Sequence, residues 1–375
     1  ILAVAFETET TIVPQSGNTG LVGGQIPFGD EVLLSLDRMS RILTVDAVDF
    51  TLTAEAGATL KSIQDAAEKV DRLFPLNLAS EGTCRIGGNL ATNAGGVNVL
   101  AYGNARDLCL GLEVVLADGR VLNQLKTLRK DNTGYDLKNL FIGSEGTLGI
   151  ITKATLKLFP QPRRYDTVFA AVPSIQSALD LLAQAKQGSG NRVIAFELLP
   201  EIGVQFTVKH MNTRRALETV SPWYVLLEMA DSTEIATQTM LETAFEQGLM
   251  TDAVVAQNQS QRAEFWALRE NMSESQKFEG GSIKHDVAVP VSALPQFIAE
   301  DSTALEAFMP GTRLCCFGHM GDGNMHFNVS QPIGMDKKTY LDQWHPMNRV
   351  IHDIVAKHNG SFSAEHGVGV LKLED

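Results

Sequence analysis

The feature that most constrains the fold is the stretch from Phe317 to Asn328, which reads FGHMGDGNMHFN. Its glycine, aspartate and asparagine residues are typical of a tight turn, and apolar residues flank them on both sides. With a four-residue loop at Gly321–Asn324, His319 would lie directly opposite His326 in a β-hairpin. Side chains opposed in this way have Cβ atoms about 4.5–5.5 Å apart, so two imidazoles can coordinate one metal ion. The stretch therefore predicts a hairpin with a two-histidine metal site; the alternative is a structural role for both histidines.

A third ligand for this site is expected from the segment Ser363–Gly369, which reads SAEHGVG. Glu365 would complete a set with His319 and His326, giving two neutral nitrogens and one carboxylate. Such a set suits Zn2+ and also Fe(II). Asn328 lies two residues beyond His326 and therefore shares its face of the strand. The sequence thus predicts a metal site whose third ligand comes from a later segment.

The overall composition is that of an ordinary globular protein, since 44% of the 375 residues are hydrophobic and 20% are charged. The net charge of −13 argues against a nucleic-acid partner, because binding phosphates requires a basic surface. No apolar run approaches the roughly 20 residues of a membrane span. Four cysteines without CxxC spacing indicate a reducing compartment and no disulfide framework.

Three glycine-rich loops mark the first 160 residues, at Ser16–Gly24, Ser80–Gly96 and Gly143–Gly149. Glycines let a backbone turn tightly and present its N–H groups to an anion. None of the three is a Walker A loop or a GxGxxG fingerprint, because the lysine and the spacing are absent. One such loop alone would be a plain turn, whereas three on one scaffold indicate an extended ligand that contains a pyrophosphate.

Hydrophobic periodicity and a proline-bounded boundary at Phe159–Arg164 predict an α+β protein of two domains, residues 1–160 and 161–375. In the first domain, residues 49–56 alternate as a strand and residues 59–68 have helical spacing. For the second domain we expect an antiparallel sheet with helices on one face. Its expected elements are strands 193–199, 223–229 and 282–289, and helices 174–187, 233–247, 261–272 and 346–358.

The glycine-rich motifs Pro14–Gly20, Ile86–Gly96 and Gly143–Gly149 resemble the FAD-binding domain of the vanillyl-alcohol-oxidase superfamily. The motif Leu128–Leu137, LRKDNTGYDL, is similar to the D-2-hydroxyglutarate dehydrogenase group among the FAD-linked D-2-hydroxyacid dehydrogenases. The resemblance covers essentially the whole chain and implies an FAD-binding domain of that type followed by an α+β substrate domain. It also implies FAD contacts from Gln15, Ser16, Gly17, Asn18, Thr19, Gly20, Ser80, Glu81, Gly82, Gly87, Gly88, Asn89, Thr92, Asn93, Ala94, Gly95, Gly96, Glu145, Gly146, Gly149, Ile150 and Ile151.

The FAD is expected to be non-covalent, because residues 1–160 contain no histidine to which a flavin could be linked. Compared with the family, the N-terminal part of the first domain and the C-terminal end of the second are expected to be missing from this sequence. A targeting segment is therefore left open. The expected compartment is the cytoplasm for a bacterial source and the mitochondrial matrix for a eukaryotic one.

The resemblance agrees with the three metal ligands named above and further implies five substrate contacts. Arg269 and Lys284 would meet substrate carboxylates, although each on its own is typical of a solvated charge. Ser273 stands where the group carries threonine, which leaves the length of the substrate open. Asn328 would orient the substrate carboxylate, and His366 would contact the substrate as the general base that takes its hydroxyl proton.

The expected activity is FAD-dependent oxidation of a D-2-hydroxyacid to the 2-oxoacid, with D-2-hydroxyglutarate or D-malate favoured. Hydride would pass to flavin N5, while a divalent metal would help His366 to deprotonate the hydroxyl. Zn2+ fits best, because the flavin already supplies the redox chemistry. The alternatives are a D-lactate or glycolate dehydrogenase of the same superfamily, and a flavin-free carrier of hydroxyacids. The expected electron acceptor is electron-transferring flavoprotein, a quinone or a cytochrome, and a homodimer remains an open alternative to a monomer.

Overall fold

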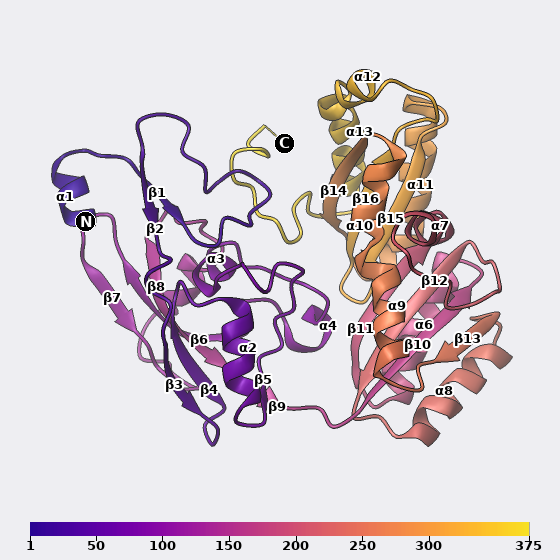
Figure 1. Ribbon diagram of the computed structural model, residues 1–375, viewed down its shortest axis with the longest axis horizontal. Helices are drawn as coiled ribbons and strands as arrows, with labels where there is room; N and C mark the ends of the chain where they lie inside the picture. Colours follow the sequence, from indigo (N-terminus) through magenta and orange to yellow (C-terminus); the bar gives the residue numbers. More distant parts are fainter. Residues whose placement is uncertain (375) are drawn as a thin grey trace. The chain divides into compact units, whose positions relative to one another are not determined.

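The computed structural model describes residues 1–374 and divides into two compact units, which can be followed by colour along the chain (Figure 1). The first unit comprises residues 1–162 together with 365–374, and the second comprises residues 163–364. The last described segment therefore groups with the first unit, whereas the predicted second domain ran on to the end of the chain.

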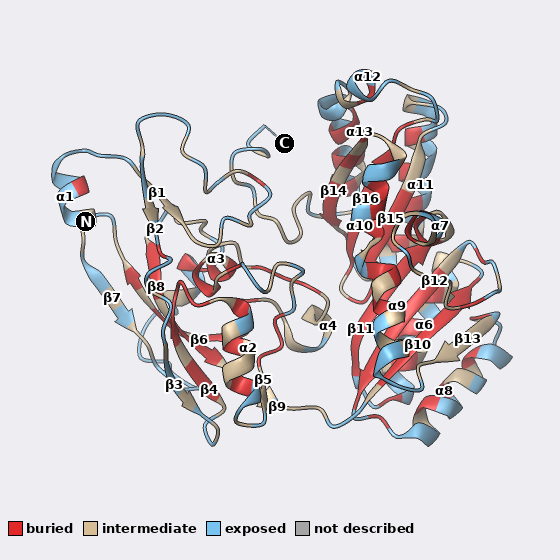
Figure 2. Ribbon diagram, in the orientation of Figure 1, coloured by how far each residue is buried: buried red, intermediate tan, exposed pale blue. Residues whose placement is uncertain are grey.

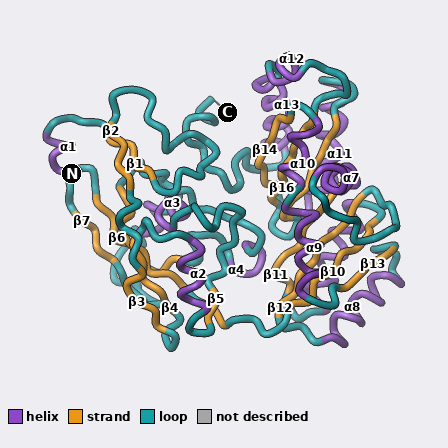
Figure 3. The backbone as a smooth tube through the Cα atoms, viewed as in Figure 1, coloured by secondary structure: helices purple, strands orange, loops and turns teal. Residues whose placement is uncertain are grey.

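The first unit is built around a five-stranded antiparallel sheet with the strand order β3-β4-β8-β6-β7. Its strands are β3 (Ile42–Asp46), β4 (Thr51–Glu55), β6 (Cys109–Val115), β7 (Val121–Gln124) and β8 (Ile150–Lys157). Outside the sheet lie the parallel pair β1 (Ile12–Gln15) and β2 (Val32–Ser35) and the antiparallel pair β5 (Arg72–Leu73) and β9 (Phe159–Pro160). Its helices are α1 (Leu2–Glu7), α2 (Leu60–Glu68), α3 (Ile86–Ala91), α4 (Val99–Tyr102) and α5 (Lys138–Phe141). Long loops, among them residues 16–31 and 125–137, connect these elements (Figure 3).

Helix α2 illustrates how local sequence determines an element of this unit. The Thr59 side chain accepts a hydrogen bond from the Ser62 N–H at 3.2 Å, which caps the first turn. Leu60, Ile63 and Ala67 recur at helical spacing and are fully buried in the core. The helix predicted from the sequence over residues 59–68 is therefore confirmed.

The second unit contains a seven-stranded antiparallel sheet with the strand order β13-β10-β12-β11-β15-β16-β14. The prediction of an antiparallel sheet is confirmed. Its strands are β10 (Tyr165–Val172), β11 (Val193–Pro200), β12 (Trp223–Ala230), β13 (Asp252–Val255), β14 (Ser282–Ala288), β15 (Arg313–His319) and β16 (Asn324–Ser330).

Helices cover both faces of this sheet, so the expectation that they lie on one face is wrong. Helices α7, α9 and α10 contact one another on the first face, and α6, α8, α11 and α13 gather on the second. The reason lies in the strands: β11 is buried at every position and β12 at all but its first (Figure 2), as in strands covered on both sides. The helices are α6 (Ile175–Gly188), α7 (Glu201–His210), α8 (Glu234–Glu246), α9 (Gln259–Glu270), α10 (Met272–Ser275), α11 (Leu294–Phe308), α12 (Lys337–Leu341) and α13 (Trp344–Lys357). None of the helices in residues 1–374 has both the length and the apolar character needed to cross a membrane.

Two neighbouring residues of β14 show how the faces alternate. The Lys284 side chain reaches Ser273 of α10, whereas the next residue, His285, reaches Asn348 of α13, with 2.9 Å between its Nε2 and the amide. Successive residues of a strand point to opposite faces. The face that meets α9 and α10 is called the site face below, because the predicted metal and substrate residues of β14, β15 and β16 lie on it.

The hairpin of β15 and β16 has a different register from the predicted one. The loop is Met320–Gly323, so His319 pairs with Asn324, and His326 pairs with Phe317. The prediction that His319 directly opposes His326 is wrong, because it missed two contacts of the turn. The Asn324 side chain donates hydrogen bonds to Asp286 and to the Val287 carbonyl of β14, which draws it into the sheet.

Gly323 takes the turn position with a φ of 88°, in the left-handed region that favours glycine. A Cβ at Gly323 would lie 2.2 Å from the Val289 carbonyl oxygen, so no larger residue fits there. The register differs from the predicted one by two residues. Because side chains alternate with a period of two, both imidazoles remain on the site face.

Candidate functional site

The site face carries a row of polar side chains across four adjacent strands. Glu197 of β11 pairs with His319 of β15, and Asp286 and Lys284 of β14 pair with His326 and Asn328 of β16. Directly paired residues of neighbouring antiparallel strands point to the same face. These polar residues therefore share one face of the sheet, together with the apolar Cys315 and Phe317 of β15, which are paired with Asn328 and His326.

The two predicted metal-binding histidines lie next to each other on this face. The ring centroids of His319 and His326 are 5.4 Å apart, and a ring nitrogen of each lies within 4.8 Å of the other. His319 is buried and His326 is half-buried. They are diagonal rather than direct partners, a geometry in which large side chains still meet. The pair is spaced so that one ion can bind both imidazoles.

Glu197 and Asp286 are residues of the site face that were not predicted from the sequence, and Glu197 has the closer contacts with the predicted residues. Its Oε1 is 2.7 Å from His319 Nδ1, and its Oε2 accepts a hydrogen bond of 2.6 Å from Arg269 Nε. Burial raises the pKa of this fully buried carboxyl, but its contacts with His319 and Arg269 outweigh burial and lower the pKa to about 2. The available signal was a single charged residue within the apolar run VIAFELLP of β11.

Arg269, predicted to meet a substrate carboxylate, is held on the last turn of α9. The side chain is buried, and the guanidinium carbon lies 4.8 Å from the centroid of the Phe317 ring. Together with the Glu197 contact, this stacking orients the guanidinium over the site face. The structure therefore assigns Arg269 a protein partner, and its contact with substrate stays a prediction.

Lys284, Ser273 and Asn328 are brought together on the same face. The Lys284 ammonium donates to the Ser273 hydroxyl at 2.7 Å and to the Ser273 carbonyl at 3.1 Å, and Lys284 is directly paired with Asn328. Burial, followed by the charge of Lys277, lowers the pKa of Lys284. A cation, an amide and a hydroxyl thus lie side by side, as carboxylate recognition requires.

Glu365 directly follows Ala364, whose backbone is hydrogen-bonded to strand β14. The Ala364 N–H donates to the Asp286 carbonyl at 3.1 Å, and Asp286 is paired with His326. Glu365 itself and His366 begin the segment that groups with the first unit. A carboxylate oxygen of Glu365 and a ring nitrogen of His366 lie within 4.8 Å of each other. Their roles as ligand and base stay predictions.

The first unit places the predicted FAD contacts on residues 15–20 after β1, residues 80–96 around α3 and residues 145–151 before β8. Two of these loops meet closely: the Gly88 N–H donates to the Ser16 hydroxyl at 3.2 Å. A Cβ at Gly17 would lie 2.4 Å from the Thr83 carbonyl oxygen, so only glycine permits this approach. Such close-packed, glycine-rich backbone fits a bound pyrophosphate.

Glu145 is one predicted FAD contact whose carboxylate already has protein partners. It accepts hydrogen bonds of 2.8 Å from the N–H groups of Val368 and Gly369, in the segment 365–374 of the same unit. The Val370 N–H donates to the Val22 carbonyl at 2.8 Å. The first unit thus holds the segment that begins with Glu365 and His366 by contacts to its own glycine-rich loops.

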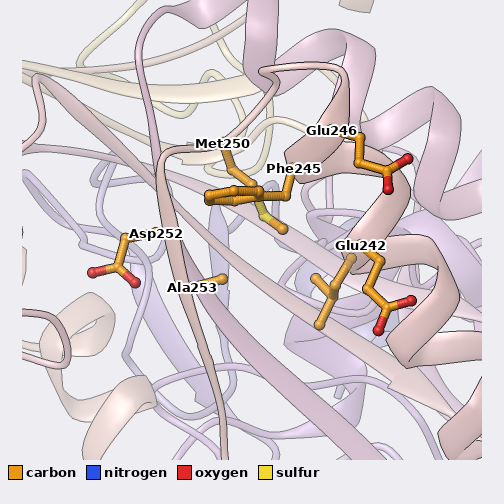
Figure 4. A pocket seen from close by; sticks show the side chains of 7 residues that line it. Glu242, Phe245, Glu246, Met250, Asp252 and Ala253 are labelled. Carbon is orange, nitrogen blue, oxygen red and sulfur yellow. The ribbon is translucent and has the colours of Figure 1, made fainter.

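A pocket in the second unit lies away from these residues. It is lined by α8 and β13, including Phe245, Met250 and Asp252 (Figure 4). Its lining contains apolar side chains and carboxylates, and none of the residues predicted to bind metal, substrate or FAD. We therefore do not assign the reaction to it.

Comparison with known proteins places both halves of the chain in families. Residues 1–124 match the FAD binding domain family, and residues 161–374 match FAD linked oxidases, C-terminal domain. A probable mitochondrial D-2-hydroxyglutarate dehydrogenase of Oryza sativa subsp. japonica is 40% identical over 100% of this chain and 66% of its own length. D-2-hydroxyglutarate dehydrogenases of Danio rerio (mitochondrial) and of Xanthomonas citri pv. viticola are 38% and 36% identical, covering 99% and 96% of this chain and 69% and 76% of theirs. The chain thus spans about two thirds of the length of these relatives.

Two solved structures share the fold. Alkyldihydroxyacetonephosphate synthase matches with a TM-score of 0.72 and 18% identity, over 96% of this chain and 69% of that one. p-Cresol methylhydroxylase matches with a TM-score of 0.73 and 14% identity, over 98% and 79%. These likenesses confirm the predicted α+β fold, and the family match of residues 1–124 confirms that it begins with an FAD-binding domain.

Proposed function

The chain belongs to the FAD-linked oxidases, in which it groups with D-2-hydroxyglutarate dehydrogenases, and on this premise we propose that it oxidises a D-2-hydroxyacid to the 2-oxoacid using FAD. The family resemblance drawn from the sequence is confirmed. The observation that carries the proposed reaction is the site face, where the His319–His326 pair of β15 and β16 lies beside the Lys284–Asn328 pair of β14 and β16. This arrangement offers a metal site for a hydroxyl beside a cation for a carboxylate.

The metal ligands in this proposal are His319, His326 and Glu365, with Zn2+ as the preferred ion. Two neutral imidazole nitrogens and a carboxylate leave coordination positions for substrate oxygens. Support for Glu365 comes from its peptide bond to Ala364, which is fixed to the strand position paired with His326. The same ligands also suit Fe(II), but a redox-inert ion suffices when a flavin accepts the electrons. Bound to such an ion, the substrate hydroxyl becomes more acidic.

Other residues of this chain would bind the substrate and take its proton. Asn328 orients the substrate carboxylate, and Lys284, joined by Arg269, neutralises carboxylate charge. His366 takes the hydroxyl proton as the general base, a role worth about 10²–10⁴-fold in rate. Ser273 holds the Lys284 ammonium in place at 2.7 Å. When bound, FAD supplies the acceptor for the hydride that leaves the substrate Cα.

We propose that FAD is held non-covalently by the loops at residues 15–20, 80–96 and 145–151. The support is their backbone: Gly17 allows two loops to approach more closely than any side chain would permit, and the Gly88 N–H donates to the Ser16 hydroxyl across the same loops. No residue of 1–160 is a histidine, so a histidyl link from this part is ruled out. Ile150 and Ile151 are buried at the start of β8 and would contact FAD through their backbone.

The preferred substrate is a dicarboxylate, D-2-hydroxyglutarate or D-malate, because Lys284 is a half-buried cation that a distal carboxylate can meet. A D-lactate or glycolate dehydrogenase is the second candidate. One relative, which is 37% identical, is named a putative mitochondrial D-lactate dehydrogenase of Schizosaccharomyces pombe. The electron acceptor is proposed to be electron-transferring flavoprotein, a quinone or a cytochrome, and a homodimer is retained as a possible assembly.

For the compartment, we retain the cytoplasm for a bacterial source and the mitochondrial matrix for a eukaryotic one. The supporting observation is that the named plant and fish relatives are mitochondrial and that a bacterial relative exists.

The test is anaerobic bleaching of the flavin in FAD-loaded protein by a panel of D-2-hydroxyacids and their L-enantiomers. D-2-Hydroxyglutarate or D-malate should bleach the visible flavin band faster than D-lactate, and the L-enantiomers should leave it intact. D-Lactate or glycolate as the fastest substrate would favour the second candidate. A protein that binds FAD but is bleached by none of these acids would contradict the proposed reaction.

A further inference from the structure

The buried carboxylate of Glu197 connects His319, one of the two proposed metal-binding histidines, to Arg269. Glu197 is fully buried, and each of its two oxygens has a different partner: His319 Nδ1 at 2.7 Å and Arg269 Nε at 2.6 Å. The partners come from β15 and α9, so the carboxylate of β11 ties together three elements. Neither partner can shift without moving the other or leaving a charge unpaired in the core.

The chemistry of this contact determines which nitrogen of His319 is available to a metal. An ionised carboxylate only accepts hydrogen bonds, so the Nδ1 that faces Glu197 must carry a proton. The lone pair of the neutral ring then lies on Nε2. Carboxylates that accept from the far nitrogen of a metal-binding histidine fix the tautomer and orientation of its ring. Glu197 has the position and the charge for that task.

We propose that Glu197 is a positioning residue that makes His319 bind the metal through Nε2 and, through Arg269, links metal retention to substrate affinity. The inference rests on the proposed function and adds a residue to it. Removing the charge of Glu197 would loosen the ring of His319 and the guanidinium of Arg269 together. Metal affinity and the KM for the hydroxyacid should therefore change in the same variant.

Glu228 provides a matched control on the next strand, β12. Like Glu197, it is buried and paired with an arginine of α9, here Arg262, through contacts of 2.6 and 2.7 Å. Its other partners are the Thr167 hydroxyl at 2.6 Å and the Trp266 indole N–H at 3.1 Å. None of these partners is assigned to the metal or the substrate. Replacing Glu228 should therefore disturb the packing of a buried ion pair, as replacing Glu197 would, without affecting a metal ligand.

The experiment compares Glu197→Gln with Glu228→Gln in the full, FAD-loaded chain. Zn2+ affinity is measured by competition with a chromophoric chelator, together with KM, kcat and the unfolding temperature. We expect Glu197→Gln to weaken Zn2+ binding about 10–100-fold and to raise KM at saturating Zn2+. Glu228→Gln should lower the unfolding temperature and leave both constants near those of the wild type. Equal losses in the two variants, or Zn2+ binding in Glu197→Gln within threefold of wild type, would overturn the proposal.

A second measurement needs no variant of Glu197 and so does not depend on its folding. Histidine ¹⁵N NMR of the wild-type protein, with the His319 signals assigned by their loss in His319→Gln, reports which ring nitrogen carries a proton. With or without metal, the proposal requires a proton on His319 Nδ1, and a deprotonated Nδ1 would overturn it. Failure of the proposed function has a different signature: wild-type protein that binds no Zn2+, or His326→Ala that binds Zn2+ normally.

Discussion

The two units carry out recognition in opposite ways. In the first unit, the predicted FAD contacts lie on loops whose glycines allow close approach, of backbone to backbone at Gly17 and of backbone to the Ser16 side chain at Gly88. In the second unit, the site lies on strands, and side chains such as His319, His326 and Lys284 present the chemistry. FAD binding by the first unit should therefore be sensitive to atoms added at its glycines. Catalysis by the second unit should be sensitive to the loss of individual functional groups.

The largest effect is expected from His366, the proposed base. His366→Ala should lower kcat by about 10²–10⁴-fold, because proton removal loses its acceptor, while metal content stays at the wild-type level. Turnover and elemental analysis of the same sample would check this, with the exposed His345→Ala as the control. A metal-free His366→Ala protein would mean that the roles of Glu365 and His366 are exchanged.

A smaller and more selective effect is expected from Lys284. Lys284→Ala should lower kcat/KM for D-2-hydroxyglutarate or D-malate by about 10–100-fold, the range for losing a charge-assisted hydrogen bond, and for D-lactate by less. The control is Lys338→Ala, an exposed lysine of the same unit that pairs with Asp342. Equal losses for diacids and D-lactate would show that Lys284 does not contact the distal carboxylate.

In the first unit, the expected sensitivity is to added atoms. A methyl group at Gly17 would lie 2.4 Å from the Thr83 carbonyl oxygen, whereas one at Gly82 would meet nothing within 4 Å. Gly17→Ala should destabilise this unit by about 1–3 kcal/mol and weaken FAD binding. Gly82→Ala should keep the wild-type unfolding temperature. Thermal unfolding and FAD titration would check both, and a stable Gly17→Ala protein with normal FAD affinity would remove the contrast between the units.

The smallest effect is expected from a buried carboxyl away from the site face. Both oxygens of Asp301, on α11, are buried and have no hydrogen-bond partner among residues 1–374. Burial, with the charge of Glu300, raises the pKa of Asp301 to about 8. The folded state therefore keeps a proton that the unfolded chain releases above about pH 4, so stability falls as pH rises from about 4 to about 8.

Asp301→Asn should remove this dependence and raise the unfolding temperature by a few degrees at pH 8, about 2–4 °C per kcal/mol, and by less at pH 5. Thermal melts across this pH range would measure the effect, with the exposed Asp342→Asn as the control. A variant with an unchanged pH slope would mean that Asp301 is ionised in the folded protein.

Features that depend on contacts between residues close in sequence could be predicted, and features that depend on distant residues could not. Helix α2 was predictable because its cap, Thr59, and its buried residues are close in sequence. The hairpin was predictable, but its register was not, because Asn324 is fixed by Asp286, 38 residues earlier. Glu197 was missed because its partner His319 lies 122 residues away. Helices on both faces of the second sheet were indicated only by the nearly continuous apolar runs of β11 and β12.

The hairpin histidines are proposed to hold a catalytic metal, and the variant His326→Ala removes one of the two imidazoles. Metal content and turnover should be measured on FAD-loaded protein, beside wild type and His345→Ala. We expect His326→Ala to lose bound metal and turnover together, while FAD content and the unfolding temperature stay close to those of the control. Full metal occupancy with near-normal turnover in His326→Ala would contradict it.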